Sequence, residues 1–166
     1  MTFNNTVLQD NPDLPAGEVI KASPYNVSAF ELFEDGLIEG RFCKYDTDTG
    51  SIDNLDASDT PVIAGIVKRK ITGEIGTGIY STSGQEIDQV AEVINFGFAT
   101  VTVTDAASPA KYDAVNVIND GTADAGKATE AAVSATSPFD IISAGDVVFW
   151  EQKAAGVWLV RINKFL

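Results

Sequence analysis

Short runs of strand-forming residues, each bounded by Gly, Asp, Asn or Thr, follow one another along most of this sequence. β-branched and aromatic residues fill the runs, and residues that favour turns separate them. Strands are expected at residues 41–45, 62–67, 98–103, 114–118 and, more weakly, 128–136. The run at 62–67 is apolar throughout, as in a strand covered on both faces. The pattern predicts an all-β fold.

Residues 85–95 fit two patterns. Ile87, Val90, Ala91 and Ile94 share one helical face, yet several of these residues are β-branched, and a strongly alternating run follows them. We therefore expect a strand, a turn at residues 95–97, and a second strand.

The C-terminal part predicts a hairpin in which residues 146–151 and 157–162 flank a loop at residues 153–156. With that loop, Trp150 faces Leu159 and Phe149 faces Val160. One face then carries Val147, Phe149, Trp158, Val160 and Ile162, and the other carries Val148, Trp150, Val157 and Leu159. A hairpin that is apolar on both faces is sandwiched inside the fold or exposes one face to a partner. Trp150 and Trp158 are accordingly candidate partner-binding residues.

The first 30 residues differ from the rest, because prolines and asparagines interrupt every candidate period. We expect an extended N-terminal arm at residues 1–30 and a single β domain at residues 31–166. Fully extended, such an arm reaches about 100 Å, enough to lie across a neighbouring subunit. Its apolar residues are candidate partner contacts: Phe3, Val7, Leu8, Leu14 and Ile20. The alternative is a partly disordered terminus.

The sequence offers little for catalysis or metal binding. It has no histidine and a single cysteine, Cys43, so it contains no Ser-His-Asp triad, Cys-His dyad or Cys/His zinc site. Asp46, Asp48 and Asp53 resemble a calcium loop, but Ser51 and Ala57 stand where an EF-hand needs Gly and Glu. The glycine-rich residues 73–78 lack the Lys-Ser/Thr of a phosphate loop. We expect no enzyme activity, cofactor or metal.

The charge narrows the choice of partners. With 24 acidic and 11 basic residues, the net charge is −13, which disfavours nucleic acid and anionic membranes. Acidic charge can simply keep copies of a protein apart, or it can meet a positive patch on a partner. The basic cluster at residues 68–70 is expected to be a solvated strand end or an intersubunit ion-pair donor.

Cys43 cannot form an internal disulfide, which favours a reducing compartment such as a bacterial cytoplasm. The first residues show no secretory signal pattern, and no apolar run is long enough to span a membrane.

The order of these strands resembles that of tailed-phage capsid decoration, or cement, proteins. The matching stretches within residues 36–162 are Gly40 to Gly50, Pro61 to Val67, Gly97 to Val103, Asp113 to Val117, and Ala144-Gly145-Asp146 before the last hairpin. Each piece is a generic strand bounded by glycine, so the order and spacing carry the likeness.

The resemblance implies a small β-barrel or β-tulip-like domain, often a homo-trimer, that sits on the outer capsid surface and staples neighbouring major capsid protein subunits in the virion. The family offers no catalytic residues. A β-sandwich adhesin or carbohydrate-binding module is the alternative, although such a module favours a flat row of exposed aromatic rings.

Overall fold

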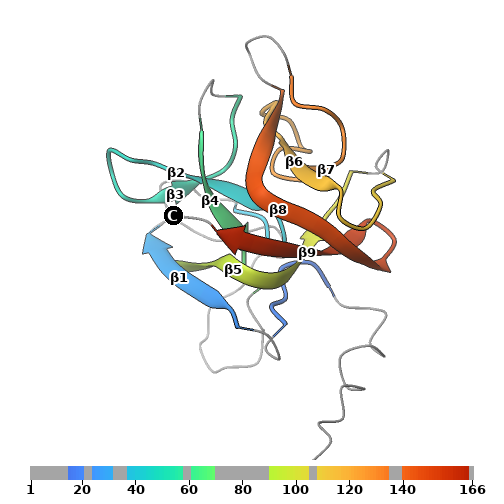
Figure 1. Ribbon diagram of the computed structural model, residues 1–166. Helices are drawn as coiled ribbons and strands as arrows, with labels where there is room; N and C mark the ends of the chain where they lie inside the picture. Colours follow the sequence, from blue (N-terminus) through green and yellow to red (C-terminus); the bar gives the residue numbers. More distant parts are fainter. Residues whose placement is uncertain are drawn as a thin grey trace, which may run out of the picture.

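The computed structural model describes residues 15–20, 24–31, 37–57, 61–69, 90–104, 108–134 and 140–164. This part of the chain contains no helix, and therefore none long and apolar enough to cross a membrane. Its strands are β1 Asn26–Glu31, β2 Phe42–Tyr45, β3 Ile52–Asp53, β4 Val62–Val67, β5 Val90–Thr102, β6 Ala114–Ile118, β7 Ala128–Thr129, β8 Ile141–Ala154 and β9 Val157–Lys164. The prediction of an all-β fold is confirmed (Figure 1).

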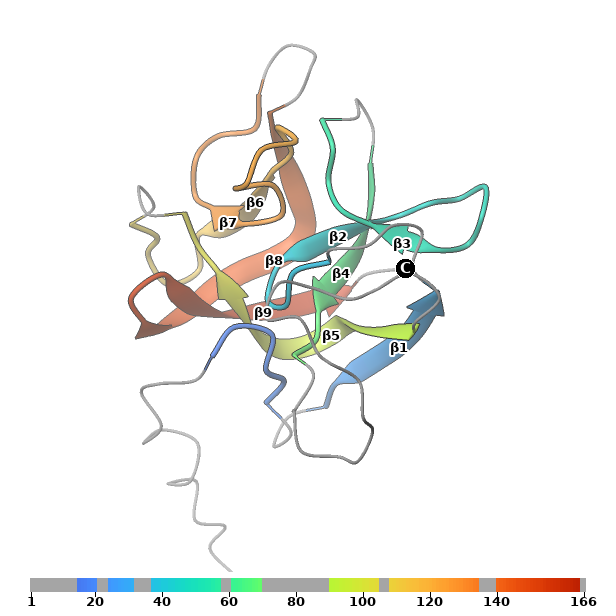
Figure 2. The same ribbon diagram turned by 180° about the vertical axis from the view of Figure 1, so that it is seen from behind.

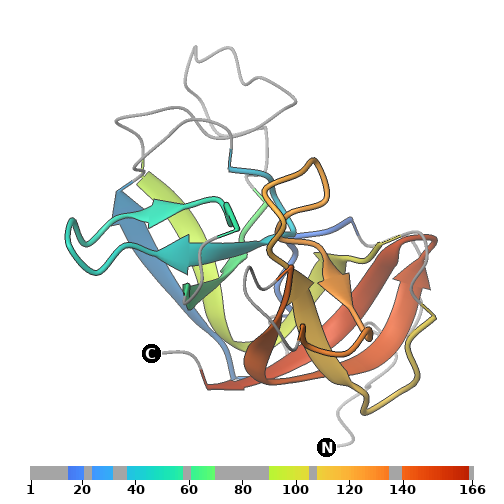
Figure 3. The same cartoon turned by 90° about the horizontal axis from the view of Figure 1, so that it is seen from above.

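The strands form one antiparallel sheet in the order β3-β2-β4-β5-β9-β8-β6-β7, and β1 also pairs with β5. β5 is shared between two halves of this sheet. Its first half pairs with β1 and β4, and its second half pairs with β9. Figure 3 shows the two groups of strands folded toward each other on either side of β5. Within the described residues no ladder joins β3 to β7, so the strand pairing leaves the sheet open where a barrel would close.

Gly97 allows β5 to belong to both halves. Its φ is +104°, a backbone conformation that residues other than glycine rarely adopt. A Cβ at this position would lie 2.6 Å from the carbonyl oxygen of Pro24. The turn expected at residues 95–97 is therefore wrong: the positive φ bends a continuous strand, and the glycine also lets the chain before β1 approach closely.

The β8–β9 hairpin has the predicted inner face. Val147, Phe149, Val160 and Ile162 are all at most 1% exposed and belong to the main core cluster, against which Trp158 packs. The predicted pairing of Phe149 with Val160 is confirmed.

The loop of this hairpin is shorter than predicted. Ala154 pairs with Val157, which leaves a turn of only two residues, Ala155 and Gly156. The shorter loop is compatible with the pairing of Phe149 and Val160 because the register of β8 shifts twice, between Phe149 and Glu151 and between Gln152 and Ala154. Leu159 therefore faces Glu151, and the predicted pairing of Trp150 with Leu159 is wrong.

Residues 15–20, here called the strap segment, run along β5 on the edge away from β9 (Figure 2). Gly17 N donates to Thr100 O at 2.8 Å, and Thr100 N donates to Glu18 O at 2.9 Å. Val19 is only 8% exposed and belongs to the main core cluster. The strap segment is thus part of the folded sheet.

β1 follows the strap segment and pairs with β5 over its whole length, Asn26–Glu31. The boundary expected between residues 30 and 31 therefore falls inside a paired strand. Prolines and asparagines interrupt the sequence pattern, but the backbone of this region still finds hydrogen-bond partners on β5. Residues 1–14, the rest of the expected arm, lie outside the described residues.

Candidate partner-binding face

Trp150 lies on β8 at the register shift between Phe149 and Glu151, and it is half-buried on the side of the hairpin opposite the core. Its ring is in edge-to-face contact with two others. The ring centroid of Phe98, on β5, is 5.2 Å away at an interplanar angle of 77°. That of Tyr112, just before β6, is 5.4 Å away at 87°. Such pairs add about 0.5–1.5 kcal/mol each to the burial of apolar area, so the three rings support one another. We call this group the aromatic face.

Tyr112 is the most exposed member of the aromatic face, at 63%. Its φ of +76° is unusual for a residue with a side chain and costs of order 1–3 kcal/mol. Two hydrogen bonds hold this backbone to β8: Tyr112 N donates to Phe149 O at 2.7 Å, and Phe149 N donates to Asp113 O at 2.9 Å. The strained position therefore presents a large ring to solvent from a fixed turn.

Lys111 lies against the aromatic face. Its Nζ is 4.1 Å from the ring centroid of Trp150 and 5.1 Å from that of Tyr112. A cation over an aromatic ring is attracted by the negative charge of the ring face. The aromatic face thus has a positive charge beside it, in a protein of net charge −13.

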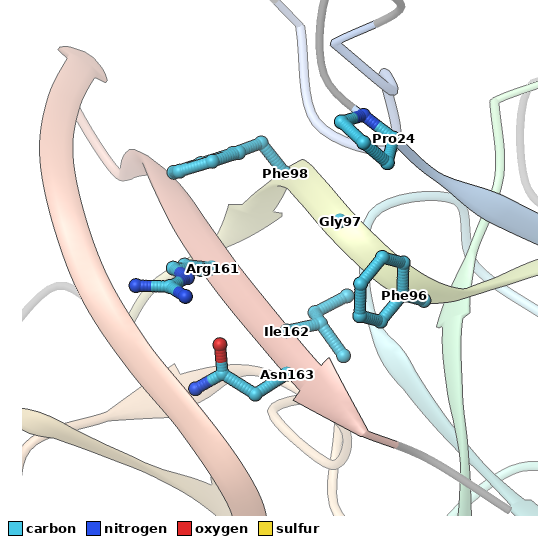
Figure 4. A pocket seen from close by; sticks show the side chains of 7 residues that line it. All are labelled: Pro24, Phe96, Gly97, Phe98, Arg161, Ile162 and Asn163. Atoms are coloured by element: carbon cyan, nitrogen blue, oxygen red, sulfur yellow. The ribbon is translucent and has the colours of Figure 1, made fainter.

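A pocket of about 530 Å³ adjoins the aromatic face and shares Phe98 with it. We call it the Arg161 pocket. It is lined by Pro24, Phe96, Gly97, Phe98, Arg161, Ile162 and Asn163. Figure 4 shows the Arg161 guanidinium between the Phe98 ring and the Asn163 amide, with Phe96 and Pro24 across the pocket. Strand register produces this arrangement, because Phe98 pairs directly with Arg161.

Arg161 differs from the other basic residues whose side chains the structure describes. Its guanidinium has no ion pair or hydrogen bond with another described residue. The rest all have ion-pair, hydrogen-bond or ring partners: Arg41, Lys44, Lys68, Arg69, Lys111, Lys127 and Lys153. The Arg161 pocket therefore combines apolar walls with an exposed positive charge that no described residue pairs with.

The residues predicted to bind partners have different positions. Trp150 is at the centre of the aromatic face. Trp158 lies on the opposite side of the hairpin, with its ring centroid 5.6 Å from that of the buried Phe149. Ile20 is half-buried in the strap segment, and its N–H donates to Phe98 O at 2.9 Å. The other four predicted residues lie outside the described part of the chain: Phe3, Val7, Leu8 and Leu14.

Sequence reasoning missed Phe98, Tyr112 and Arg161. The sequence predicts a strand at Phe98 and a hairpin strand at Arg161, but local patterns do not show that these two strands pair with each other. The signal available for Tyr112 was its place directly before Asp113 at the start of an expected strand, which suits a turn.

The side chain of Asp46, in the loop that resembles a calcium site, stabilises a turn. Asp46 Oδ1 accepts hydrogen bonds from Asp48 N at 2.8 Å and from Thr49 N at 3.2 Å. These backbone hydrogen bonds lower the pKa of the Asp46 carboxyl. Among the described residues, no three possible metal ligands gather at one point.

The basic cluster at residues 68–70 is neutralised in part by the chain itself. Lys68 pairs with Glu92, and the Nε of Arg69 lies 3.9 Å from a carboxylate oxygen of Glu39. Lys70 lies outside the described residues.

The aromatic face also differs from a sugar-binding platform. A platform needs ring faces lying flat in one row, whereas Phe98 and Tyr112 both stand nearly perpendicular to Trp150. Lys111 in addition lies over the Trp150 ring. This geometry suits a protein contact better than stacking on a sugar ring.

An all-β fold that presents the rings of the aromatic face to solvent suits a protein that acts by binding other proteins. The chain belongs to the XM1 gp53 minor capsid protein family, which it matches over residues 3–164.

Among solved structures, the chain is similar to a chain of "The capsid of Myoviridae Phage XM1". The two sequences are 71% identical, the match covers 100% of both chains, and the TM-score is 0.78. The search of curated proteins gave no match. The protein is therefore a minor capsid protein of a phage and a structural part of the virion.

Proposed function

We propose that this minor capsid protein is a decoration, or cement, protein that binds the outer surface of the phage head and staples neighbouring major capsid protein subunits. The aromatic face carries the proposal. Tyr112 is 63% exposed and Trp150 half-buried, and both are fixed on adjoining strands and turns. Tyr and Trp are the residues most enriched in the energetic centres of protein interfaces.

The net charge of the protein supports a position on the outer surface of the head. The inside of a filled phage head faces packaged DNA, and a chain of net charge −13 is repelled by phosphates. The same charge is tolerated on the side of the shell that faces solvent. An external position also suits a reinforcing role, because many copies that each bridge adjacent subunits add up to a large resistance to expansion.

We further propose that the protein works as a homo-trimer. A cyclic trimer repeats the same contact three times and presents three aromatic faces to a shell, which raises the apparent affinity without new contacts. Sedimentation equilibrium of the purified protein tests this. A monomer at micromolar concentration contradicts the trimer and leaves the decoration role intact.

The decoration role is tested with heads prepared without this protein, mixed with the purified protein and sedimented. Wild-type protein is expected to sediment with the heads, to appear on their outer surface by electron cryomicroscopy, and to raise the temperature at which they break open.

Tyr112→Ala removes the most exposed ring of the aromatic face, and it is expected to weaken head binding by about 30-fold, as for an interface residue worth about 2 kcal/mol. Val62→Ala is the matched control, because Val62 is also exposed, at 38%, but lies on β4 in the other half of the sheet. Protein found inside the heads, or heads that take up no wild-type protein, would overturn the proposal.

A further inference from the structure

The Arg161 pocket contains a positive charge that has no ion-pair partner among the described residues, although the chain has acidic residues to spare. Acidic residues outnumber basic ones by 24 to 11, so a shortage of carboxylates does not explain it. One nearby carboxylate, that of Asp146, accepts a hydrogen bond from Asn163 Nδ2 at 2.8 Å instead. Asn163 lines the pocket itself. The guanidinium therefore remains available to a group from outside the chain.

The walls of the pocket strengthen any ion pair that forms there. Phe98 is paired with Arg161 across the strands, and Phe96 is 40% exposed beside it. Once a partner covers these rings, water is excluded, and the lower local dielectric increases the attraction between opposite charges. A guanidinium also offers parallel N–H groups that match the two oxygens of a carboxylate.

The pocket is preformed. Apart from Pro24, its lining comes from β5 and β9, which are neighbours at the centre of the sheet, and at Gly97 β5 lies close to the backbone of Pro24 and Tyr25. A site of this kind loses little conformational entropy when a partner binds. The space of about 530 Å³ accommodates a charged side chain together with one apolar neighbour.

We propose that the Arg161 pocket binds an Asp or Glu side chain that the capsid partner presents next to an apolar side chain. The carboxylate pairs with Arg161, and the apolar side chain packs between Phe96 and Phe98. Complementary charge argues for this occupant, because an acidic partner segment is repelled by most of this protein's surface and attracted here. Such a contact fixes the orientation of the protein on the shell. The proposal rests on the decoration role proposed above.

The test measures head binding by co-sedimentation over a range of NaCl concentrations for wild-type protein, Arg161→Gln, Arg161→Lys and the control Arg69→Gln. Arg69 is also exposed, but it lies just after β4 and near Glu39. Arg161→Gln is expected to weaken binding at least about 30-fold and to reduce its salt dependence. Arg161→Lys should recover only part of the affinity, because it keeps the charge and loses the paired N–H groups. Arg69→Gln should bind like wild type.

The possible outcomes separate the two proposals. If wild-type protein does not bind heads, the decoration role fails and this inference fails with it. If wild-type protein binds and Arg161→Gln binds equally well with the same salt dependence, only this inference fails. Competition by short single-stranded DNA that depends on Arg161 would show that the pocket takes phosphate, which also overturns it. Unfolding temperatures of all variants should match, since Arg161 is exposed.

Discussion

Replacing Gly40 with alanine should displace the strap segment from its packing position and destabilise the fold. Gly40 has φ +74°, and a Cβ there would lie 2.2 Å from Ala16 Cβ and 2.8 Å from the backbone N of Gly17. Carbon atoms in contact are normally about 3.5–4.0 Å apart. Alanine has no rotamer that relieves the clash, so the strap segment must move. Gly40 N also donates to Val67 O, and its carbonyl accepts from Thr102 N, both at 2.8 Å, so Gly40 is held in place and cannot itself move away from the clash.

The magnitude follows from a control that lacks the clash. Gly145, inside β8, has φ +81°, but a Cβ there meets nothing within 4 Å. Gly145→Ala therefore costs only the left-handed conformation, about 1–2 kcal/mol. Gly40→Ala carries that cost and an overpacking cost at the upper end of about 1–3 kcal/mol. Since about 1 kcal/mol shifts the unfolding temperature of a chain of this size by roughly 2–4 °C, Gly40→Ala should unfold about 6–12 °C below Gly145→Ala.

Thermal unfolding followed by circular dichroism, together with urea titration, measures the difference. The double variant Ala16→Gly/Gly40→Ala removes the 2.2 Å contact and keeps the 2.8 Å backbone contacts, so it should recover part of the loss. Equal unfolding temperatures for Gly40→Ala and Gly145→Ala would refute the reasoning, since they would mean that the strap segment does not pack on Gly40.

Three further predictions follow from the same contacts. Removing residues 1–31 takes away the strap segment and β1 and should lower the unfolding temperature severely; an unchanged unfolding temperature would contradict the pairing with β5. Burial raises the pKa of the Cys43 thiol to about 12, so a thiol reagent should label the folded protein at neutral pH far more slowly than the urea-unfolded protein, and fast labelling of the folded form would argue against a buried Cys43. Backbone hydrogen bonds lower the pKa of Asp46 in the folded state, so its contribution to stability is present above the ordinary pKa of an aspartate and is lost as the pH falls through the folded pKa. Asp46→Asn should therefore flatten the acid side of the curve of unfolding free energy against pH. An unchanged curve would count against the turn contacts.

The hairpin shows how far local patterns predict structure. Alternation of apolar residues identified the inner face of β8 and β9, because burial requires a period of two along each strand. The register shift at Trp150 could not be predicted, because the residues after it, Glu151, Gln152 and Lys153, are polar and give no apolar alternation that would reveal an extra residue. Trp150 lies on the outer face, as its predicted role as a partner-binding residue requires. The predicted role of Trp158 in partner binding stays a prediction.

At Gly97 the local pattern led to a wrong prediction. Asn95-Phe96-Gly97 has the composition of a turn, and a turn was predicted. Glycine supplies a positive φ for a bent strand as readily as for a turn, and only the packing of Pro24 and Tyr25 against it decides between them. The Arg161 pocket depends on the same long-range packing, which is why no local pattern pointed to it. The order and spacing of glycine-bounded runs predict a phage capsid protein, and the family match confirms a capsid-associated family.

The sharing of β5 between the two halves of the sheet has a consequence for how the molecule opens. A fluctuation that separates β9 from β5 also disturbs the strand on which β1, β4 and the strap segment depend. Because both halves hold β5 in hydrogen bonds, the amides of β5 should be among the slowest to exchange with solvent. A force that pulls on one half is accordingly transmitted through β5 to the other half.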